Sequence, residues 1–191
     1  MPAYRRLREK YSFHELLSNS DLAAEATMSI LDVCDPDGLI IFSDILTILA
    51  ALGAEVSYEP ELSVKAPPFD RLLQTFDPSP LLPTYEAIEK VSSEKGEIKA
   101  LIGFCGGPFT LLSYLLEDVP RFKAFLLQQE TFARKVLERI GSVVAAEMCI
   151  RDSSGKRELR CFRSSIQMQE SSTLLFLCAL PFRPLRKFWI A

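Results

Sequence analysis

Three stretches of the chain carry apolar residues at the spacing of an amphipathic helix. Residues 20–33 start at Ser20, a candidate N-cap, and residues 84–96 end at a glycine that suits a helix C-terminus. Residues 121–148 form the longest of the three stretches. The apolar positions of this third helix that we expect to face the core are Phe125, Phe132, Val136, Ile140 and either Val143 or Val144.

Two short runs are apolar along nearly their whole length and predict buried strands. They read "GLIIFSD", residues 38–44, and "KALIGF", residues 99–104. A strand that is apolar on both faces is typical of a parallel sheet covered by helices. We therefore expect the two runs to be parallel strands of one sheet.

Six prolines lie between Pro60 and Pro83 and predict a long ordered loop with little regular structure. Long loops in compact domains usually carry function or are disordered. With this loop, the predicted order is helix, strand, loop, helix, strand, helix, helix. Buried strands that alternate with helices predict an α/β architecture. Two strands are too few for a stable sheet, so we expect either further strands or an incomplete chain.

The stretch "CGGPFTLLSYLLE" predicts a glycine-rich bend that opens a helix. Pro108 is tolerated in the first helical turn. The bend lacks the Lys-Ser/Thr pair of a P-loop and the spacing of a dinucleotide fingerprint, so it indicates close backbone packing instead of phosphate binding. Cys105 takes a small-residue position in this bend and need not be a nucleophile.

Composition narrows the class of protein. The chain has 191 residues, 48% of them apolar, and a formal net charge of −3, which gives no electrostatic reason to expect nucleic acid as a partner. The longest apolar stretch near the end of the chain, residues 174–180, is far too short to span a membrane. Five irregularly spaced cysteines and no signal peptide indicate a reducing, cytoplasmic setting.

Asp44 is the first candidate for chemistry, because it follows four apolar residues at the end of a predicted strand. Burying an unpaired carboxylate is costly, so this side chain either reaches solvent, caps the next helix or is held in place for function. His14 is the single histidine and has no second ligand at metal-binding spacing. We expect it to be a surface residue and predict no metal site.

Three segments resemble the uroporphyrinogen decarboxylase family: "PAYRRLREKYSFHELLSNSDLAAEATMSIL", "PDGLIIFSDILTILAALGAEVSYE" and "ALIGFCGGPFTLLSYLLED". The resemblance covers residues 2 to about 148. It implies part of a (β/α)8 barrel with its ligand at the C-terminal ends of the strands. It also implies a carboxy-lyase that removes four acetate carboxyls from uroporphyrinogen III to form coproporphyrinogen III, in haem and chlorophyll biosynthesis, without any cofactor.

The resemblance also implies roles for four residues. Asp44 matches the family's strand-end aspartate, which accepts hydrogen bonds from pyrrole N–H groups and balances a cationic intermediate. Tyr114 and Arg8 match residues that contact the substrate's carboxylates, and Phe13 matches an aromatic at the pocket mouth. From the residues alone, other roles stay open: a core aromatic for Tyr114, a solvated helix charge for Arg8 and a buried staple for Phe13.

The chain departs from the family pattern at both ends. The family's Arg-Gln-Ala-Gly-Arg segment, which carries two carboxylate-binding arginines, has no counterpart before "MPAYR". Residues 149–191 resemble nothing in the family, and the net charge changes from −8 over residues 1–148 to +5 over residues 149–191. We therefore expect a partial barrel at 1–148 and a non-matching tail that is either artefactual or a genuine extension. Such a fragment is expected to have open sheet edges and little catalysis of its own.

Two other functions stay open at this point. The related corrinoid-dependent methyltransferases share the barrel but bind zinc through His and Cys residues late in the chain, and a partial barrel could also be a non-catalytic binding module. The substrate is expected to be a small molecule, with neither nucleic acid nor membrane as a partner. Members of the family commonly form homodimers. If the chain came from an alga or a plant, a plastid location would replace the cytoplasmic one.

Overall fold

The two apolar runs form neighbouring strands of one sheet, as the sequence predicts. In the computed structural model, which describes residues 2–95, 98–117, 119–154 and 178–179, β1 (Gly38–Ile40) pairs in parallel with β4 (Ala100–Gly103). Leu39 lies opposite Leu101, and both side chains are buried. β5 (Cys178–Ala179) pairs antiparallel with the other edge of β4. The predicted parallel pairing is therefore confirmed, and the third strand was not predicted.

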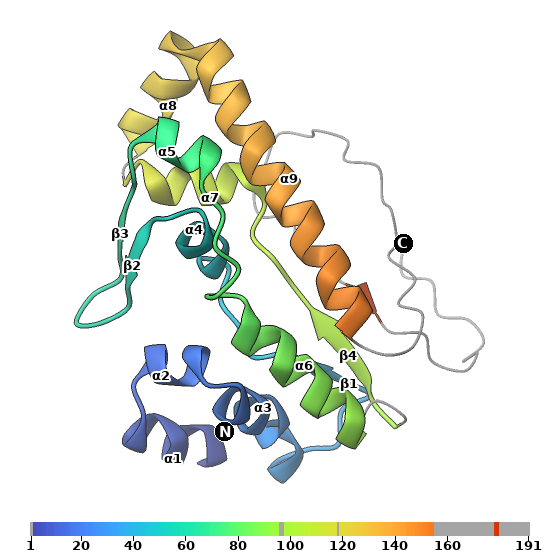
Figure 1. Ribbon diagram of the computed structural model, residues 1–191. Coiled ribbons are helices and arrows are strands. Elements are labelled where there is room, and N and C mark those ends of the chain that lie inside the picture. The colour runs from blue at the N-terminus through green and yellow to red at the C-terminus, as the bar shows by residue number, and fades with distance from the viewer. Residues whose placement is uncertain (1, 96–97, 118, 155–177, 180–191) are drawn as a thin grey trace, which may run out of the picture.

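Short helices precede and cover this sheet (Figure 1). The chain begins with α1 (Pro2–Lys10), α2 (Phe13–Ser18) and α3 (Ser20–Met28), followed by the 3-10 turn η1 (Ser29–Asp32). α6 (Leu82–Lys95) packs beside α3, and the two helices bury one face of β1 and β4. The residues of this cluster are Ala23, Ala24, Leu39, Ile41, Ala87, Ile88, Val91 and Leu101.

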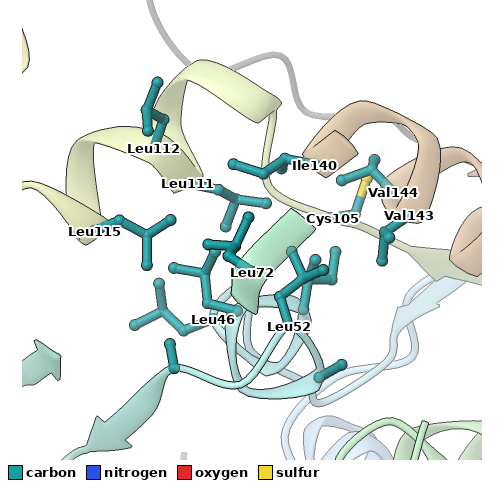
Figure 2. Close-up of a cluster of buried hydrophobic side chains, with 14 of the residues drawn as sticks. Leu46, Leu52, Leu72, Cys105, Leu111, Leu112, Leu115, Ile140, Val143 and Val144 are labelled. Atoms are coloured by element: carbon teal, nitrogen blue, oxygen red, sulfur yellow. The ribbon is translucent and has the colours of Figure 1, made fainter. Parts of the chain in front are cut away.

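A second and larger core lies at the C-terminal ends of the two parallel strands. It gathers α4 (Thr47–Ala51), α5 (Phe69–Gln74), α7 (Pro108–Leu115) and α9 (Glu130–Ser154). Figure 2 shows Leu111 and Leu115 of α7 facing Leu46 and Leu72, with Ile140 of α9 closing one side. Burial of aliphatic side chains is the main favourable contribution to folding here, at about 1.5–3 kcal/mol for each fully buried Leu or Ile.

The segment rich in proline contains more regular structure than predicted. β2 (Glu55–Ser57), which precedes the segment, forms a hairpin with β3 (Ser63–Lys65), which lies within it. The helix α5 also lies within the segment. The prolines lie beside these elements or at their ends: Pro68 is the N-cap of α5, and Pro83 lies in the first turn of α6. Proline is tolerated in a first turn, where its missing N–H would have no helical partner. The expectation of one long irregular loop is wrong.

Two other helix predictions need correction. The predicted helix over 121–148 is two helices, α8 (Val119–Gln128) and α9, divided at Gln129. Phe125 of α8 and Phe132 of α9 both pack against Phe69 of α5. The N-cap of α3 is Asn19, whose side chain accepts the backbone N–H groups of Asp21 and Leu22. The inward positions predicted for the long helix are buried or packed against the core.

The first strand is also less enclosed than predicted. Leu39 is fully buried, whereas Ile40 is 61% exposed, so one face of β1 is uncovered by the described residues. β1 is an edge strand of the sheet. Taken together, the described residues form a mixed α/β fold that is mostly helical with short strands, and they do not close a barrel.

The predictions about residues 149–191 fall mostly outside the described residues. α9 continues to Ser154 and so crosses the predicted boundary at 148, and β5 is the other described part of 149–191. The division of the chain at 148 stays a prediction. Within the described residues, no helix combines the length and the apolar character needed to cross a bilayer.

Candidate functional site

Asp44 lies where the sequence predicts, in the turn between a parallel strand and the helix after it. Backbone pairing continues from β1 to Ile41, whose N–H donates to the carbonyl of Ile102 at 2.9 Å. Asp44 follows three residues later, and α4 begins at Thr47. The C-terminal ends of parallel strands are where ligands bind in open and closed α/β sheets.

Close packing beneath this turn holds it in place. Gly106, in the bend after β4, lies so near that a Cβ atom on it would be 3.1 Å from the Cβ of Ile45 and 2.8 Å from Leu111 Cδ2. A side chain at this position would force Leu111 and Ile45 to shift, so glycine favours this close approach. The prediction that "GFCGGPF" is a place of close backbone packing is confirmed, and Cys105 in the same bend is buried.

The Asp44 carboxylate is half-buried and accepts two hydrogen bonds. Both reach Oδ1: the backbone N–H of Leu46 donates at 2.7 Å and the hydroxyl of Tyr58 at 3.2 Å. The contact with Leu46 is the local turn-capping contact that the sequence left open as an alternative. The contact with Tyr58 is not local, because this residue follows β2. Asp44 thus forms the turn and also belongs to a site cluster whose residues come from different segments. The other members are Arg8, Phe13, Tyr58 and Glu59.

Burial changes the acidity of both partners. Burial raises the pKa of Asp44, although the hydrogen bonds from Leu46 and Tyr58 act in the opposite direction. Burial also raises the pKa of Tyr58, and the negative charge and hydrogen bond of Asp44 add to this increase. Tyr58 therefore keeps its proton and remains a hydrogen-bond donor. The charged form of Asp44 is disfavoured by these surroundings, and N–H donors or a cation beside the carboxylate would relieve that cost.

Phe13 connects this carboxylate to the N-terminal helices. Its ring packs edge-on against Tyr58, with centroids 5.0 Å apart, and against Phe42 at 5.6 Å. Phe13 is the first residue of α2, which Ser12 and Glu15 cap reciprocally. The capping box fixes the start of α2 and with it the position of the Phe13 ring.

Arg8 joins the same cluster from α1. Its guanidinium carbon lies 5.6 Å from the centroid of the Phe13 ring, and Nη2 donates to Glu59 Oε1 at 3.3 Å. Nη1 donates to the carbonyl of Tyr11 at 3.0 Å. These contacts order a guanidinium that has five N–H donors, so donors remain for a ligand's carboxylate.

Tyr114 lies apart from these contacts. It is on α7, beside three leucines that face the core, and its own side chain is 36% exposed. Neither a hydrogen bond nor a ring contact joins its side chain to the other described site residues. Its exposure argues against the alternative of a core aromatic. Its contact with a substrate carboxylate stays a prediction.

Sequence reasoning missed Tyr58 and Glu59. They occupy consecutive positions after β2 and hold different parts of the cluster: Tyr58 contacts Asp44, and Glu59 contacts Arg8 and accepts the Phe13 N–H at 3.2 Å. No motif marks them, because each contact joins segments far apart in the chain. His14 is exposed, as expected, and within the described ranges no three His, Cys, Asp or Glu side chains gather as a metal site.

Comparison with known proteins adds a family to this geometry. The model of the uroporphyrinogen decarboxylase (URO-D) family matches residues 1–151. Proteins named uroporphyrinogen decarboxylase from Roseiflexus sp. (strain RS-1) and Aquifex aeolicus (strain VF5) are each 34% identical over 86% of this chain and 51% of their own. One from Trichodesmium erythraeum is 31% identical over 97% of this chain and 56% of its own. The chain spans about half the length of the curated relatives it matches.

A solved structure resembles the fold. It is described as a methyltransferase from Methanosarcina mazei, with a TM-score of 0.58 and 17% sequence identity. The likeness covers 75% of this chain and 48% of that one. At this level of identity, the likeness is evidence for the fold alone.

Proposed function

This chain belongs to the uroporphyrinogen decarboxylase family, and we propose that it serves the decarboxylation of uroporphyrinogen III to coproporphyrinogen III. In this proposal the described residues are part of a (β/α)8 barrel, and the substrate lies at the C-terminal ends of β1 and β4. The observation that carries the proposal is the half-buried Asp44 carboxylate at the end of β1, with Arg8 held nearby through Phe13 and Tyr58.

The reaction needs an anion near the pyrrole nitrogens more than it needs a nucleophile. Protonation of a pyrrole ring carbon makes the ring cationic. The C–C bond to the acetate carboxylate then breaks, and its electron pair neutralises the ring as carbon dioxide leaves and an exocyclic methylene remains. A proton from solvent converts this methylene to the methyl group of the product, and the ring carbon releases its added proton to restore the pyrrole. A fixed carboxylate stabilises the cation without reorganising, which is how preorganised charges contribute to catalysis.

Asp44 is suited to this role by its surroundings. Burial makes its negative charge unfavourable in the free protein, so pyrrole N–H donors and the ring cation gain more at this carboxylate than they would at an exposed one. We assign Asp44 to binding and charge stabilisation. Arg8 and Tyr114 would bind the substrate's carboxylates, and Phe13 would line the entrance.

Binding is the direct test of this proposal, because the chain spans about half of its relatives and the sequence predicts little turnover. Uroporphyrinogen III is titrated into the purified chain, and coproporphyrinogen formation is followed in the same samples. We expect binding that weakens by roughly tenfold or more in Asp44→Asn, the loss expected for one hydrogen bond to a charged group. A wild-type chain that is folded but does not bind the porphyrinogen would contradict the proposal.

The two alternatives give different results in simple assays. Zinc bound in proportion to the purified protein would support a corrinoid-dependent methyltransferase. A non-catalytic binding module would bind without forming any coproporphyrinogen, even in the presence of the rest of a family barrel. The likeness to a methyltransferase structure concerns the fold, and it does not favour either activity.

A further inference from the structure

The two oxygens of the Asp44 carboxylate have different surroundings. Oδ1 accepts hydrogen bonds from Leu46 and Tyr58, and two bonds use the ordinary accepting capacity of one carboxylate oxygen. Oδ2 accepts none from the described residues, and it is not one of the fully enclosed polar atoms that lack a partner. The side chain therefore offers one accessible oxygen to a ligand.

The hydroxyl that occupies Oδ1 is itself held rigidly. The Tyr58 ring is half-buried, and it makes an edge-type contact with the Phe13 ring at an interplanar angle of 64°. A phenol has few rotatable bonds, so packing of the ring fixes the position of its hydroxyl. The hydroxyl of Tyr58 remains a donor at neutral pH, because burial raises the pKa of this phenol and it keeps its proton.

Glu59, the residue after Tyr58, contacts the part of the cluster that comes from α1 and α2. Glu59 Oε1 accepts hydrogen bonds from Arg8 Nη2 and from the N–H of Phe13. Figure 1 shows the loop of the β2–β3 hairpin extending from beside α4 toward α2. The end of β2 thus joins the Asp44 turn to the first two helices.

From this arrangement we propose that Tyr58 is a positioning residue for Asp44. By occupying Oδ1, Tyr58 leaves Oδ2 as the oxygen that accepts N–H donors of the ligand, and it sets the direction in which Oδ2 points. The identity of that ligand as a porphyrinogen rests on the proposed function. The positioning itself rests on the hydrogen bonds and ring contacts of this chain.

The proposal has a consequence that a purely structural role for Tyr58 would not have. A hydrogen bond donated to a carboxylate stabilises its charged form, so removing the hydroxyl of Tyr58 raises the pKa of Asp44 further. Among the described residues, Tyr58 is the ionisable side chain that contacts Asp44. Arg8 and Glu59 are charged groups of the same cluster, and their described contacts are with each other and with Phe13 and Tyr11, not with Asp44.

The test is a titration of the Asp44 carboxyl carbon by NMR in the purified chain, in the wild type and in Tyr58→Phe. The phenylalanine keeps the ring and its contact with Phe13, and the backbone amide spectrum checks that the fold is retained. Tyr11→Phe is the matched control, because it removes the same hydroxyl from an exposed ring between α1 and α2. We expect a higher Asp44 pKa in Tyr58→Phe and no change in the control.

Binding of uroporphyrinogen III by the same proteins gives a second measurement. We expect the affinity of Tyr58→Phe to fall roughly tenfold, since one oriented hydrogen bond to a charged group is lost. An Asp44 pKa that stays the same or falls in Tyr58→Phe would overturn the positioning role. If the wild type binds no porphyrinogen while Asp44 titrates as expected, the proposed function fails and the positioning role stands.

Discussion

Gly106 and Ile45 approach closely at the base of the candidate site, so that a Cβ atom added to Gly106 would make an unusually tight contact. A Cβ on Gly106 would lie 3.1 Å from Ile45 Cβ, next to Asp44 in the chain. The bend after β4 therefore supports the turn after β1. The packing of one strand end decides where the carboxylate of the neighbouring strand lies.

We predict that Gly106→Ala destabilises the chain by about 1–3 kcal/mol, because the added methyl group overpacks this contact. Gly107→Ala is the matched control. Its Cβ would have no atom within 4 Å, and its φ of −66° suits alanine. Urea unfolding followed by circular dichroism should show a loss for the first variant and no loss for the second. Equal effects of the two substitutions would contradict this account of the bend.

The raised pKa of Asp44 predicts a specific dependence of stability on pH. The folded state holds this proton more tightly than the unfolded state, whose aspartate titrates near its ordinary pKa of about 3.9. Stability from this group is therefore fully present below the unfolded pKa, and it is lost as the pH rises through the folded pKa. Asp44→Asn lacks this titration. Its free energy of unfolding should increase relative to the wild type as the pH rises from about 4.

Glu15→Gln is the control, and its stability relative to the wild type should change with pH in the opposite direction. Hydrogen bonds from Ser12 lower the pKa of Glu15, so stability from that carboxylate is present above its unfolded pKa and is lost as the pH falls through its folded pKa. Relative to the wild type, Glu15→Gln should thus lose stability as the pH rises, the reverse of Asp44→Asn. A difference between Asp44→Asn and the wild type that stays constant with pH would show that Asp44 is not desolvated.

Phe13 should contribute to stability through its ring contacts as well as through burial. Phe13→Leu removes two edge-on contacts, with Phe42 and Tyr58, and we expect a loss of about 1 kcal/mol. Phe109→Leu is a suitable comparison, because that ring is 45% exposed and has one ring partner, Phe122, at 6.5 Å. Thermal or urea unfolding should give the larger loss for Phe13→Leu.

Arg8 should matter more for ligand binding than for stability. Its ion pair with Glu59 is partly exposed, so Arg8→Lys should change the free energy of unfolding by at most about 1 kcal/mol. A lysine cannot bind a carboxylate with two parallel hydrogen bonds, so the affinity for uroporphyrinogen III should fall. Arg6→Lys, at an exposed pair with Asp32, should change neither quantity. Equal affinities of the two variants would remove Arg8 from the site.

Several features of the fold could be predicted from the order of apolar residues. The strands predicted within 38–44 and 99–104, the helix α6, and Pro108 at the start of α7 all follow from local patterns. Such a pattern of apolar residues favours the same helix or strand whichever other elements pack against it. The position of Asp44 after a strand was visible for the same reason.

Other features could not be predicted because they depend on partners far along the chain. The helix over 121–148 is divided at Gln129, and the rings on either side of the division, Phe125 and Phe132, pack on Phe69. Phe69 lies in a segment whose prolines predict irregular structure. Asn19 caps α3 because Ser20 instead donates to Glu86 of α6. In both places the local pattern allows more than one structure, and the one adopted includes contacts with residues distant in the chain.

What the sequence alone determined is the family pattern, the parallel pair of strands and the acidic residue after the first of them. Only the tertiary structure decided what surrounds that acid: the Tyr58 hydroxyl on one oxygen, the Phe13 ring behind it and the Glu59 link to Arg8. The physical reason is the range of the interactions. Periodic burial depends on residues that are close together in the sequence. The hydrogen bonds and ring contacts of this cluster require that the residues after β2 lie against both the Asp44 turn and α2, which local sequence does not decide.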